Sequence, residues 1–381
     1  MKKIIVACDS YKGCLSSKEV NEAIALGVKN EERSVKNSHD SLESSLDILQ
    51  LEMSDGGEGM LDAFLSAMHG ERVTIHAHDA LMRWIEADYG IVRKAGGANG
   101  ASLGDATAIV EIAQTAGLAL IEPEQRNPMK TTSWGVGELI LHAYRHGIRK
   151  FIVGLGGSAT SDCGIGMFKA MGDDWKKIRQ DCTFVLASDV TNPLCGPQGA
   201  AHVFAPQKGA DEEMVESLDA RARRFAEVSA RHFGEDKSCT PGAGAAGGLG
   251  YAFLEYFRAE FRPGAEVLLE TLNFDKLLKD AALVITGEGH SDEQTLMGKL
   301  PQRILEHAKR QDVKCWLVSG GVSNQQPLLD AGFDRVIAVT PKDMSLQEAM
   351  KPEIAKANIT HVISFFLEKS IKVSFLRKNT L

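Results

Sequence analysis

The sequence of 381 residues lacks the cysteine pattern of a disulfide framework or of a structural zinc site. It has seven cysteines, an odd number, and no two of them are spaced as CxxC. Disulfide-stapled domains need paired cysteines, and structural zinc sites use short regular spacings. We therefore expect free thiols and a protein of the reducing cytoplasm.

The sequence also lacks a long apolar run. No stretch of about 18 apolar residues occurs, which is the length that a membrane-spanning helix needs. Near the N-terminus the apolar run Ile4 to Cys8 is shorter than the ~7–15 residues of a signal-peptide core. We therefore predict no membrane partner and no secretion signal.

No basic tract stands out. Lys and Arg number 43 against 51 Asp and Glu, which gives a net charge of −8. A nucleic-acid partner is therefore not expected. A small anionic substrate stays open, because a few local lysines decide its binding rather than the net charge.

Several catalytic signatures are missing. Gly298-Lys299 is followed by Leu300, so the chain has no Walker A motif, and the protein-kinase catalytic signature is absent as well. His142 and His146 have the spacing of a zinc-binding helix, but Ala143 stands where a zincin has glutamate. A solvated helix face is the better interpretation of that histidine pair.

Glycine is more frequent than usual, with 37 residues or about 10% against a typical ~7%. The excess lies in five polar loops, four of which follow an apolar run typical of a strand. Backbone amides in such loops approach an anion without a Cβ in the way. The five loops are Cys8–Ser17, Ser54–Gly59, Gly154–Gly164, Pro241–Gly250 and Thr286–Gln294.

The pattern of elements predicts an α/β protein of two domains. Strands followed by helices at both ends indicate a parallel-sheet domain, and alternating residues around Ile85–Ile91 with a turn at Gly96-Gly97 indicate a hairpin in a mixed second domain. We predict one discontinuous domain of residues 1–70 and 275–381, and an inserted domain of residues 71–274. Arg33–Ser45 is polar and is interpreted as a solvated excursion.

The first two loops carry acids beside glycine. Asp9, Ser10 and Lys12 follow the first predicted strand, at the edge where α/β sheets bind ligands, and Lys12 can neutralise a phosphate or a carboxylate. An exposed salt-bridging loop is the alternative. The second loop supplies candidate hydroxyl-binding or helix-capping groups, namely Asp55, Gly56, Gly57 and Glu58.

The third loop admits two interpretations. Gly154, Gly156 and Ala159 match the dinucleotide fingerprint G-x-G-x-x-A, which would indicate an NAD(P)-dependent oxidoreductase. The acid expected about 20 residues later is misplaced, since Asp189 is nearer 30 residues away. A phosphate-binding loop is an equal interpretation, with candidate residues Gly156, Gly157, Ser158, Thr160 and Asp162.

Two later segments supply a candidate base and candidate cation ligands. Asp189 follows an apolar run, close to Asn192, and can accept a proton from a substrate alcohol. Lys208 stands on a turn as a second candidate for an anion. In the last loop Gly287 precedes Glu288 and Asp292, a carboxylate pair that suits Mg²⁺, although helix capping by Asp292 is the competing account.

Taken together, these segments resemble the bacterial type-1 glycerate kinase family. The matching segments cover nearly the whole chain in order: DSYKGCLSS, SDGGEG, TTSWGVGELI, GGSATSDCG, ASDVTNPL, FAPQKGA, PGAGAAGGLG and VITGEGHSD. The resemblance implies phosphorylation of D-glycerate with ATP and Mg²⁺, with the 2-hydroxyl favoured. It also implies a Rossmann/flavodoxin-like domain interrupted by an inserted α/β domain, with the active site in the cleft between them. Self-association is left open.

The sequence departs from the family pattern at four places. Family members usually have Asn where Ser161 stands, Gly where Cys163 stands and often Arg where His290 stands. Family chains also carry a longer segment where only Asp173–Cys182 intervene here. A non-catalytic anion-binding protein is the third interpretation, but it gives no account of so many separate polar loops.

Overall fold

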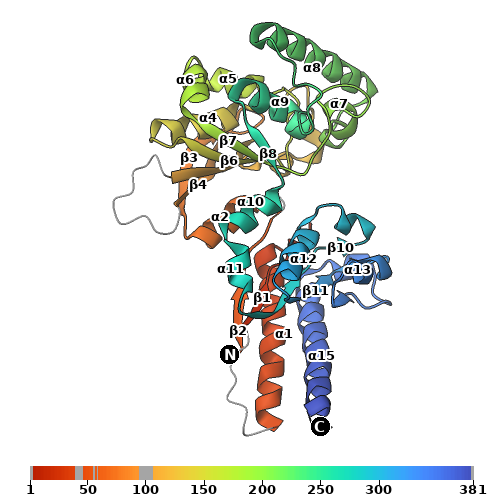
Figure 1. Ribbon diagram of the computed structural model, residues 1–381. Helices are drawn as coiled ribbons and strands as arrows, with labels where there is room; N and C mark the ends of the chain where they lie inside the picture. The colour runs from red at the N-terminus through yellow and green to blue at the C-terminus, as the bar shows by residue number, and fades with distance from the viewer. Residues whose placement is uncertain (1–2, 39–45, 55, 58, 94–105, 379–381) are drawn as a thin grey trace. The chain divides into compact units, whose positions relative to one another are not determined.

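The computed structural model describes all residues except 1–2, 39–45, 55, 58, 94–105 and 379–381 (Figure 1). Contacts divide the chain into unit 1, made of Met1–Ser54 and Leu268–Leu381, and unit 2, made of Asp55–Val267. The predicted fold class is confirmed, since a parallel-sheet unit built from both chain ends is interrupted by a mixed α/β unit. This division differs from the predicted domain ranges over residues 55–70 and 268–274.

Unit 1 contains a five-stranded sheet with the strand order β13-β11-β9-β1-β2, in which all the pairs are parallel. Its apolar residues are buried on both faces, as a parallel sheet requires. The two-stranded pair β10 and β12 follows β9 and β11 in the chain. The strands are β1 (Lys3–Val6), β2 (Asp47–Gln50), β9 (Ala281–Thr286), β10 (His290–Ser291), β11 (Lys314–Ser319), β12 (Gly321–Val322) and β13 (Arg335–Ala338).

Two long helices of unit 1 lie side by side, α1 and α15 (Figure 1). A Cβ at Gly27 would lie 2.7 Å from the carbonyl oxygen of Thr360, so glycine allows this close approach. No helix in the described part of the chain is long and apolar enough to span a membrane. The helices are α1 (Ser17–Ser38), α11 (Phe274–Leu278), α12 (Leu300–Arg310), α13 (Gln326–Asp330), α14 (Leu346–Ala349), α15 (Pro352–Lys378) and the 3₁₀ helix η5 (Glu293–Leu296).

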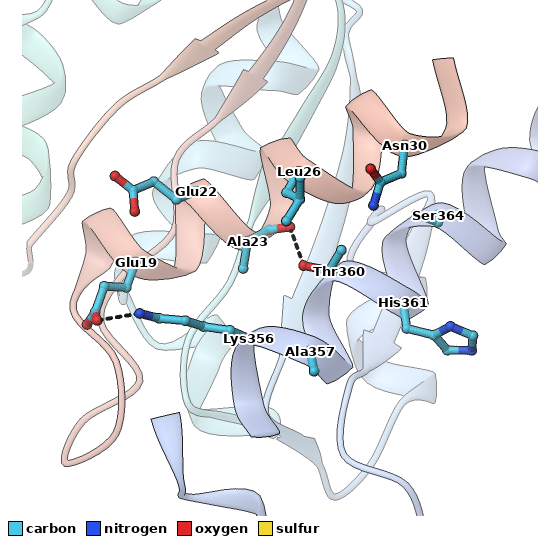
Figure 2. Close-up of a pocket in the computed structure, with 10 residues that line it drawn as sticks. All are labelled: Glu19, Glu22, Ala23, Leu26, Asn30, Lys356, Ala357, Thr360, His361 and Ser364. Atoms are coloured by element: carbon cyan, nitrogen blue, oxygen red, sulfur yellow. Dashed lines mark hydrogen bonds and ion pairs between the residues drawn. The ribbon is translucent and has the colours of Figure 1, made fainter. Parts of the chain in front are cut away.

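A hollow of about 600 Å³ opens between α1 and α15 (Figure 2). At one end of it the Nζ atom of Lys356 donates to Glu19 at 2.7 Å. This bond, helped by the backbone amide of Ser16, lowers the pKa of the Glu19 carboxyl to about 2. None of the predicted site residues lines this hollow, so it belongs to the packing of the two helices.

Unit 2 contains a six-stranded sheet with the strand order β3-β4-β5-β6-β7-β8. The first three strands are antiparallel and the last four are parallel, which gives the mixed sheet that the sequence predicts. The turn predicted at Gly96-Gly97 lies outside the described residues. The strands are β3 (Glu71–His78), β4 (Trp84–Arg93), β5 (Ala106–Glu111), β6 (Lys150–Gly154), β7 (Thr183–Ala187) and β8 (Glu260–Arg262).

The helices of unit 2 pack on this sheet around a core that includes Phe151, Phe184 and Phe253. They are α2 (Met60–Met68), α3 (Ala113–Ala116), α4 (Trp134–Arg145), α5 (Ile165–Met171), α6 (Asp174–Asp181), α7 (Ala200–Phe204), α8 (Glu212–Phe233) and α9 (Ala245–Phe257), with the 3₁₀ helices η2 (Leu118–Leu120), η3 (Pro123–Gln125) and η4 (Pro206–Lys208). Helix α10 (Gly264–Thr271) crosses from unit 2 to unit 1.

The predicted solvated excursion is wrong over its first part, because α1 continues through residues 33–38. Residues 31–36 contain Glu, Arg and Lys and no Gly or Pro, so their intrinsic preference favours a helix although they lack an apolar stripe. The segment Asp173–Cys182 forms α6 and leads directly into β7.

Candidate functional site

In unit 2 the candidate loops begin at one edge of the sheet. Glu111, Gly154 and Ala187 pair in register at the ends of β5, β6 and β7. Since these three strands are parallel, the loops that follow them start side by side. The carboxyl edge of parallel strands is where open α/β sheets bind ligands.

The second and third glycine loops are in backbone contact within this unit. A Cβ at Gly156 would lie 2.4 Å from the Cα of Gly57, and one at Gly56 would lie 2.7 Å from the carbonyl oxygen of Ala187. Only glycine allows this approach, because real Cβ atoms do not come within 3 Å of another backbone. The structure thus brings together two loops that are about 100 residues apart. Asp55 and Glu58 lie outside the described residues.

Asp162 organises the third loop. One carboxylate oxygen accepts hydrogen bonds from the Ser133 amide at 2.9 Å, the Ser133 hydroxyl at 2.9 Å and the Gly166 amide at 3.0 Å. Thr132 donates to the same oxygen at 3.4 Å, and the Gly164 amide donates to the other oxygen at 3.1 Å. With five donors on it, this carboxylate fixes the loop against the start of α4, although the sequence suggested it as a phosphate-loop ligand.

Cys163 takes a backbone conformation that favours glycine, with φ of 52°. Its amide donates to the carbonyl of Gly247 at 3.1 Å, and a Cβ at Gly247 would lie 2.0 Å from the carbonyl oxygen of Thr160. The fourth loop therefore packs against the third. Glycine would take this backbone conformation without strain.

The third loop is not a dinucleotide turn. In the dinucleotide fingerprint the glycine turn opens a helix directly, so that a pyrophosphate binds at the helix N-terminus. Here β6 ends at Gly154 and α5 begins only at Ile165. The oxidoreductase interpretation therefore finds no support in the structure.

Lys208 is the most unusual charged group in this set. Its side chain is buried, with the residue only 3% exposed, and its Nζ atom donates to the Ser158 hydroxyl at 2.9 Å and to the Thr160 carbonyl at 2.7 Å. Burial lowers the pKa of Lys208 to about 7, against an opposing effect of the negative charge of Asp162. The side-chain hydroxyls of Thr160 and Ser161 are buried and accept or donate no hydrogen bond within the described chain.

Asp189 and Asn192 lie on the loop that follows β7. Asp189 is exposed, and the neighbouring Ser188 hydroxyl accepts from the Val190 amide at 3.2 Å. Asn192 donates through its side-chain amide to the Gln198 carbonyl at 2.9 Å. Its own carbonyl accepts from Gly244 at 2.9 Å, so this loop is tied to the fourth glycine loop.

In unit 1 the first and last loops follow neighbouring strands, β1 and β9. The Asp9 amide donates to the Gly287 carbonyl at 2.9 Å, and the buried Asp9 carboxylate accepts from the Ser10 amide at 2.7 Å. A Cβ at Gly289 would lie 3.6 Å from the Lys12 amide. Asp9, Ser10, Lys12 and Gly287 are thus brought to one edge of the unit 1 sheet.

Glu288 is surrounded by donors. One of its carboxylate oxygens accepts from Thr295 at 2.7 Å and from Ser291 at 3.1 Å, and the other lies 3.2 Å from the Nζ atom of Lys299. Asp292 accepts from the Gln294 amide at 2.8 Å and forms a capping box with Thr295 at the start of η5. The described residues contain no group of three or more potential metal ligands.

The sequence prediction did not include Lys299 among the candidates. In the sequence, Gly298-Lys299 attracts attention only because it fails to complete a Walker A motif. The signal that could have identified Lys299 is its position just before α12, which places it at a helix start next to the last loop. Asp162 differs, because the sequence names it as a candidate ligand, whereas its structural role depends on partners about 30 residues away.

Comparison with known proteins shows the family of this chain. The model of the glycerate kinase family matches residues 4–178 and 173–367, and the two matched segments overlap over residues 173–178, at the start of α6. A glycerate kinase of Bacillus cereus is 35% identical over 94% of this chain and 95% of its own length. A glycerate 2-kinase of Escherichia coli K12 is 34% identical over 92% and 93%. A crystal structure of a Salmonella typhimurium LT2 protein assigned as glycerate kinase 2 has a TM-score of 0.79, 34% identity, and coverage of 98% and 99%.

Proposed function

Because this chain belongs to the glycerate kinase family and is a kinase that acts on an alcohol group, we propose that it transfers the γ-phosphoryl group of ATP to the 2-hydroxyl of D-glycerate. The products are 2-phosphoglycerate and ADP. The observation that carries this proposal is Lys208, a buried lysine whose Nζ atom donates to the third glycine loop at Ser158 and Thr160. Its hydrogen-bond partners among the described residues are both neutral.

Phosphoryl transfer demands mainly positioning and neutralisation of charge. In our proposal the amides of Gly56, Gly57, Gly156 and Gly157, with Ser158 and Thr160, bind oxyanion groups. Lys208 supplies a positive charge beside them, and Lys12 does the same in unit 1, next to Ser10 and the Gly287 backbone. The Asp9 carboxylate in that loop is proposed to accept a hydrogen bond from a substrate hydroxyl. A lysine serves as a point charge for phosphate or carboxylate.

Asp189 is proposed as the general base. It accepts the proton of the 2-hydroxyl as the oxygen attacks the γ-phosphorus, the bond from that phosphorus to the bridging oxygen breaks, and ADP leaves with the electron pair. Asn192, three residues later, is proposed to hold the substrate hydroxyl. An exposed carboxylate at the edge of the sheet is accessible to such a substrate.

Mg²⁺ is proposed to enter as the complex with ATP. Asp292 caps η5 and Glu288 already accepts from two hydroxyls and lies beside Lys299, so these two carboxylates do not fit an ion that both of them hold. Mg²⁺ keeps several waters and binds one or two carboxylates plus phosphates, so it supplies neutralisation of phosphate charge. The predicted cleft location of the site stays a prediction.

Release of ADP from MgATP, measured in a coupled assay with a panel of small hydroxy acids, tests this function. We expect turnover with D-glycerate above all others, and a phosphorus NMR spectrum of the product that matches 2-phosphoglycerate. A folded protein that releases no ADP above background with D-glycerate would contradict the proposal. If the product is 3-phosphoglycerate, the proposed kinase activity stands, but the phosphorylated hydroxyl is the 3-hydroxyl instead of the 2-hydroxyl.

A further inference from the structure

The pairing of Lys208 is incomplete in a specific way. An ammonium group forms up to three hydrogen bonds and carries a full charge, yet its two partners here are a hydroxyl and a carbonyl. In the described part of the chain no carboxylate lies within 4.0 Å of its Nζ atom. A buried charge is stable only when it is paired or when it gives up its proton.

The charged and titratable groups around Lys208 do not supply the missing anion. The Asp162 carboxylate is taken up by five other donors, and burial raises the pKa of the Cys163 thiol, so that this group is neutral. Arg126 packs against Gly209, but its side chain is a cation. Asp211 follows closely in the chain, but its carboxylate accepts from the Met214 amide as the N-cap of α8. Among the described residues, therefore, no carboxylate is hydrogen-bonded to Lys208, and the Asp162 charge acts on it only from beyond hydrogen-bond distance.

Near neutral pH such a lysine is divided between amine and ammonium, because burial brings its pKa to about 7. An oxyanion that binds beside it favours the ammonium form by direct electrostatic attraction. The pKa of Lys208 is then higher in the complex than in the free protein, and the difference appears as bound protons.

We propose that binding of an oxyanion ligand to the glycine loops of unit 2 is coupled to uptake of one proton by Lys208. This inference rests on the proposed function and deepens it. The ligand is a carboxylate or a phosphoryl group, which the two substrates carry respectively. The lysine thus makes affinity for one substrate depend on pH, with tight binding when Lys208 is protonated.

The sign of the pH dependence follows from the raised pKa in the complex. Below the pKa of the free protein Lys208 is already protonated, so binding takes up no proton. Above it, each unit of pH weakens binding about tenfold until the pKa of the complex is reached, since a pKa unit is worth about 1.4 kcal/mol. The Michaelis constant of that substrate therefore rises with pH above about 7.

Isothermal titration calorimetry in two buffers of different ionisation enthalpy measures the number of protons taken up. D-glycerate alone and a non-hydrolysable MgATP analogue alone are titrated separately, at pH 6 and at pH 8. We expect about 0.9 proton taken up at pH 8 with one of the two ligands and about 0.1 at pH 6. The ligand that shows the uptake identifies whether the carboxylate or the phosphoryl group binds at Lys208.

Lys208→Met removes the titrating group and keeps the apolar stem, and Lys177→Met on the exposed face of α6 is the matched control. Uptake is expected to vanish in the first variant and to persist in the second. Equal uptake in Lys208→Met and wild type overturns the proposal, and so does no uptake by wild type at pH 8 with either ligand.

If Lys208→Met does not fold, NMR of wild-type protein labelled at the lysine ε-carbon gives the same answer. A lysine signal that titrates near pH 7 in the free protein and above pH 9 with ligand supports the proposal, and titration of all lysines above pH 9 in the free protein overturns it. The proposed function fails separately if the protein releases no ADP. In that case binding of an oxyanion can still be accompanied by proton uptake at Lys208.

Discussion

Each unit has a lysine beside loops that follow parallel strands, namely Lys299 in unit 1 and Lys208 in unit 2. The two lysines differ in how their charge is balanced. In unit 1 Lys299 is 42% exposed and lies 3.2 Å from Glu288, which two hydroxyls also bind. In unit 2 Lys208 is buried, and its described hydrogen-bond partners are both neutral. Lys299 thus has a carboxylate partner, whereas no described carboxylate is hydrogen-bonded to Lys208.

This difference distinguishes an ion pair that holds a loop in place from a buried lysine that we propose binds a substrate anion. A compensated, half-exposed ion pair contributes little free energy and is screened by water and salt. A buried cation without a carboxylate partner lowers the stability of the fold, and such groups are found mainly at functional sites. The comparison therefore points to unit 2 as the unit in which a substrate anion is needed most.

Asp189→Asn gives the largest expected effect on rate. The substitution keeps the side-chain shape and removes the proton acceptor, so we expect kcat to fall by ~10²–10⁴. Steady-state ADP release measures it. Asp173→Asn, at an exposed side chain before α6, is the control with unchanged kcat. A kcat for Asp189→Asn within threefold of wild type would mean that another group is the base.

Asp162→Ala tests the structural carboxylate of the same unit. Five donors lose their acceptor, and we expect the free energy of unfolding to fall by about 3 kcal/mol, measured by urea denaturation. Asp162→Asn keeps part of the hydrogen bonding and should lose less. If both variants unfold at the wild-type urea concentration, the loop is held by other contacts.

Lys12→Met should raise the Michaelis constant of one substrate about tenfold, which corresponds to ~1.4 kcal/mol, and should leave kcat within threefold. The physical reason is loss of a point charge for a phosphate or a carboxylate. Lys18→Met, at an exposed position early in α1, serves as the control. Unchanged constants for both substrates would make Lys12 an ordinary loop lysine.

Asp292→Ser gives the smallest expected effect and decides between cap and metal ligand. Serine also caps helices, so we expect a loss of less than ~1 kcal/mol in unfolding free energy and no change in the Mg²⁺ dependence of turnover. A rise of tenfold or more in the Mg²⁺ concentration needed for half-maximal rate would instead assign Asp292 to the ion.

Elements whose signals are local were predicted well. The amphipathic pattern of Glu212–Phe233 predicts a long helix, and α8 spans that range because Asp211 caps its start and Gly234 ends it with φ of 78°. The spacing of Ser16 and Glu19 predicts a capping box, which is present, with the Ser16 amide donating to Glu19 at 2.9 Å. The wrong interpretation fell on residues 33–38, where a helix continues without an apolar stripe.

The candidate site was predicted as a set of residue types on loops, and the roles of these residues depend on long-range contacts. The partners of Lys208 lie 48 and 50 residues earlier in the chain, so its burial has no local signal. The donors to Asp162 from Ser133 likewise lie 29 residues away. The catalytic roles of Asp189, Lys12 and Lys208 stay predictions.

The most direct test of the account compares Lys208→Met with Lys299→Met in steady-state kinetics with D-glycerate and MgATP. We predict that loss of the uncompensated Lys208 raises the Michaelis constant of one substrate at least tenfold at pH 7, while loss of the compensated Lys299 changes both constants by less than threefold. Equal effects of the two substitutions, or a larger effect at Lys299, would contradict the account.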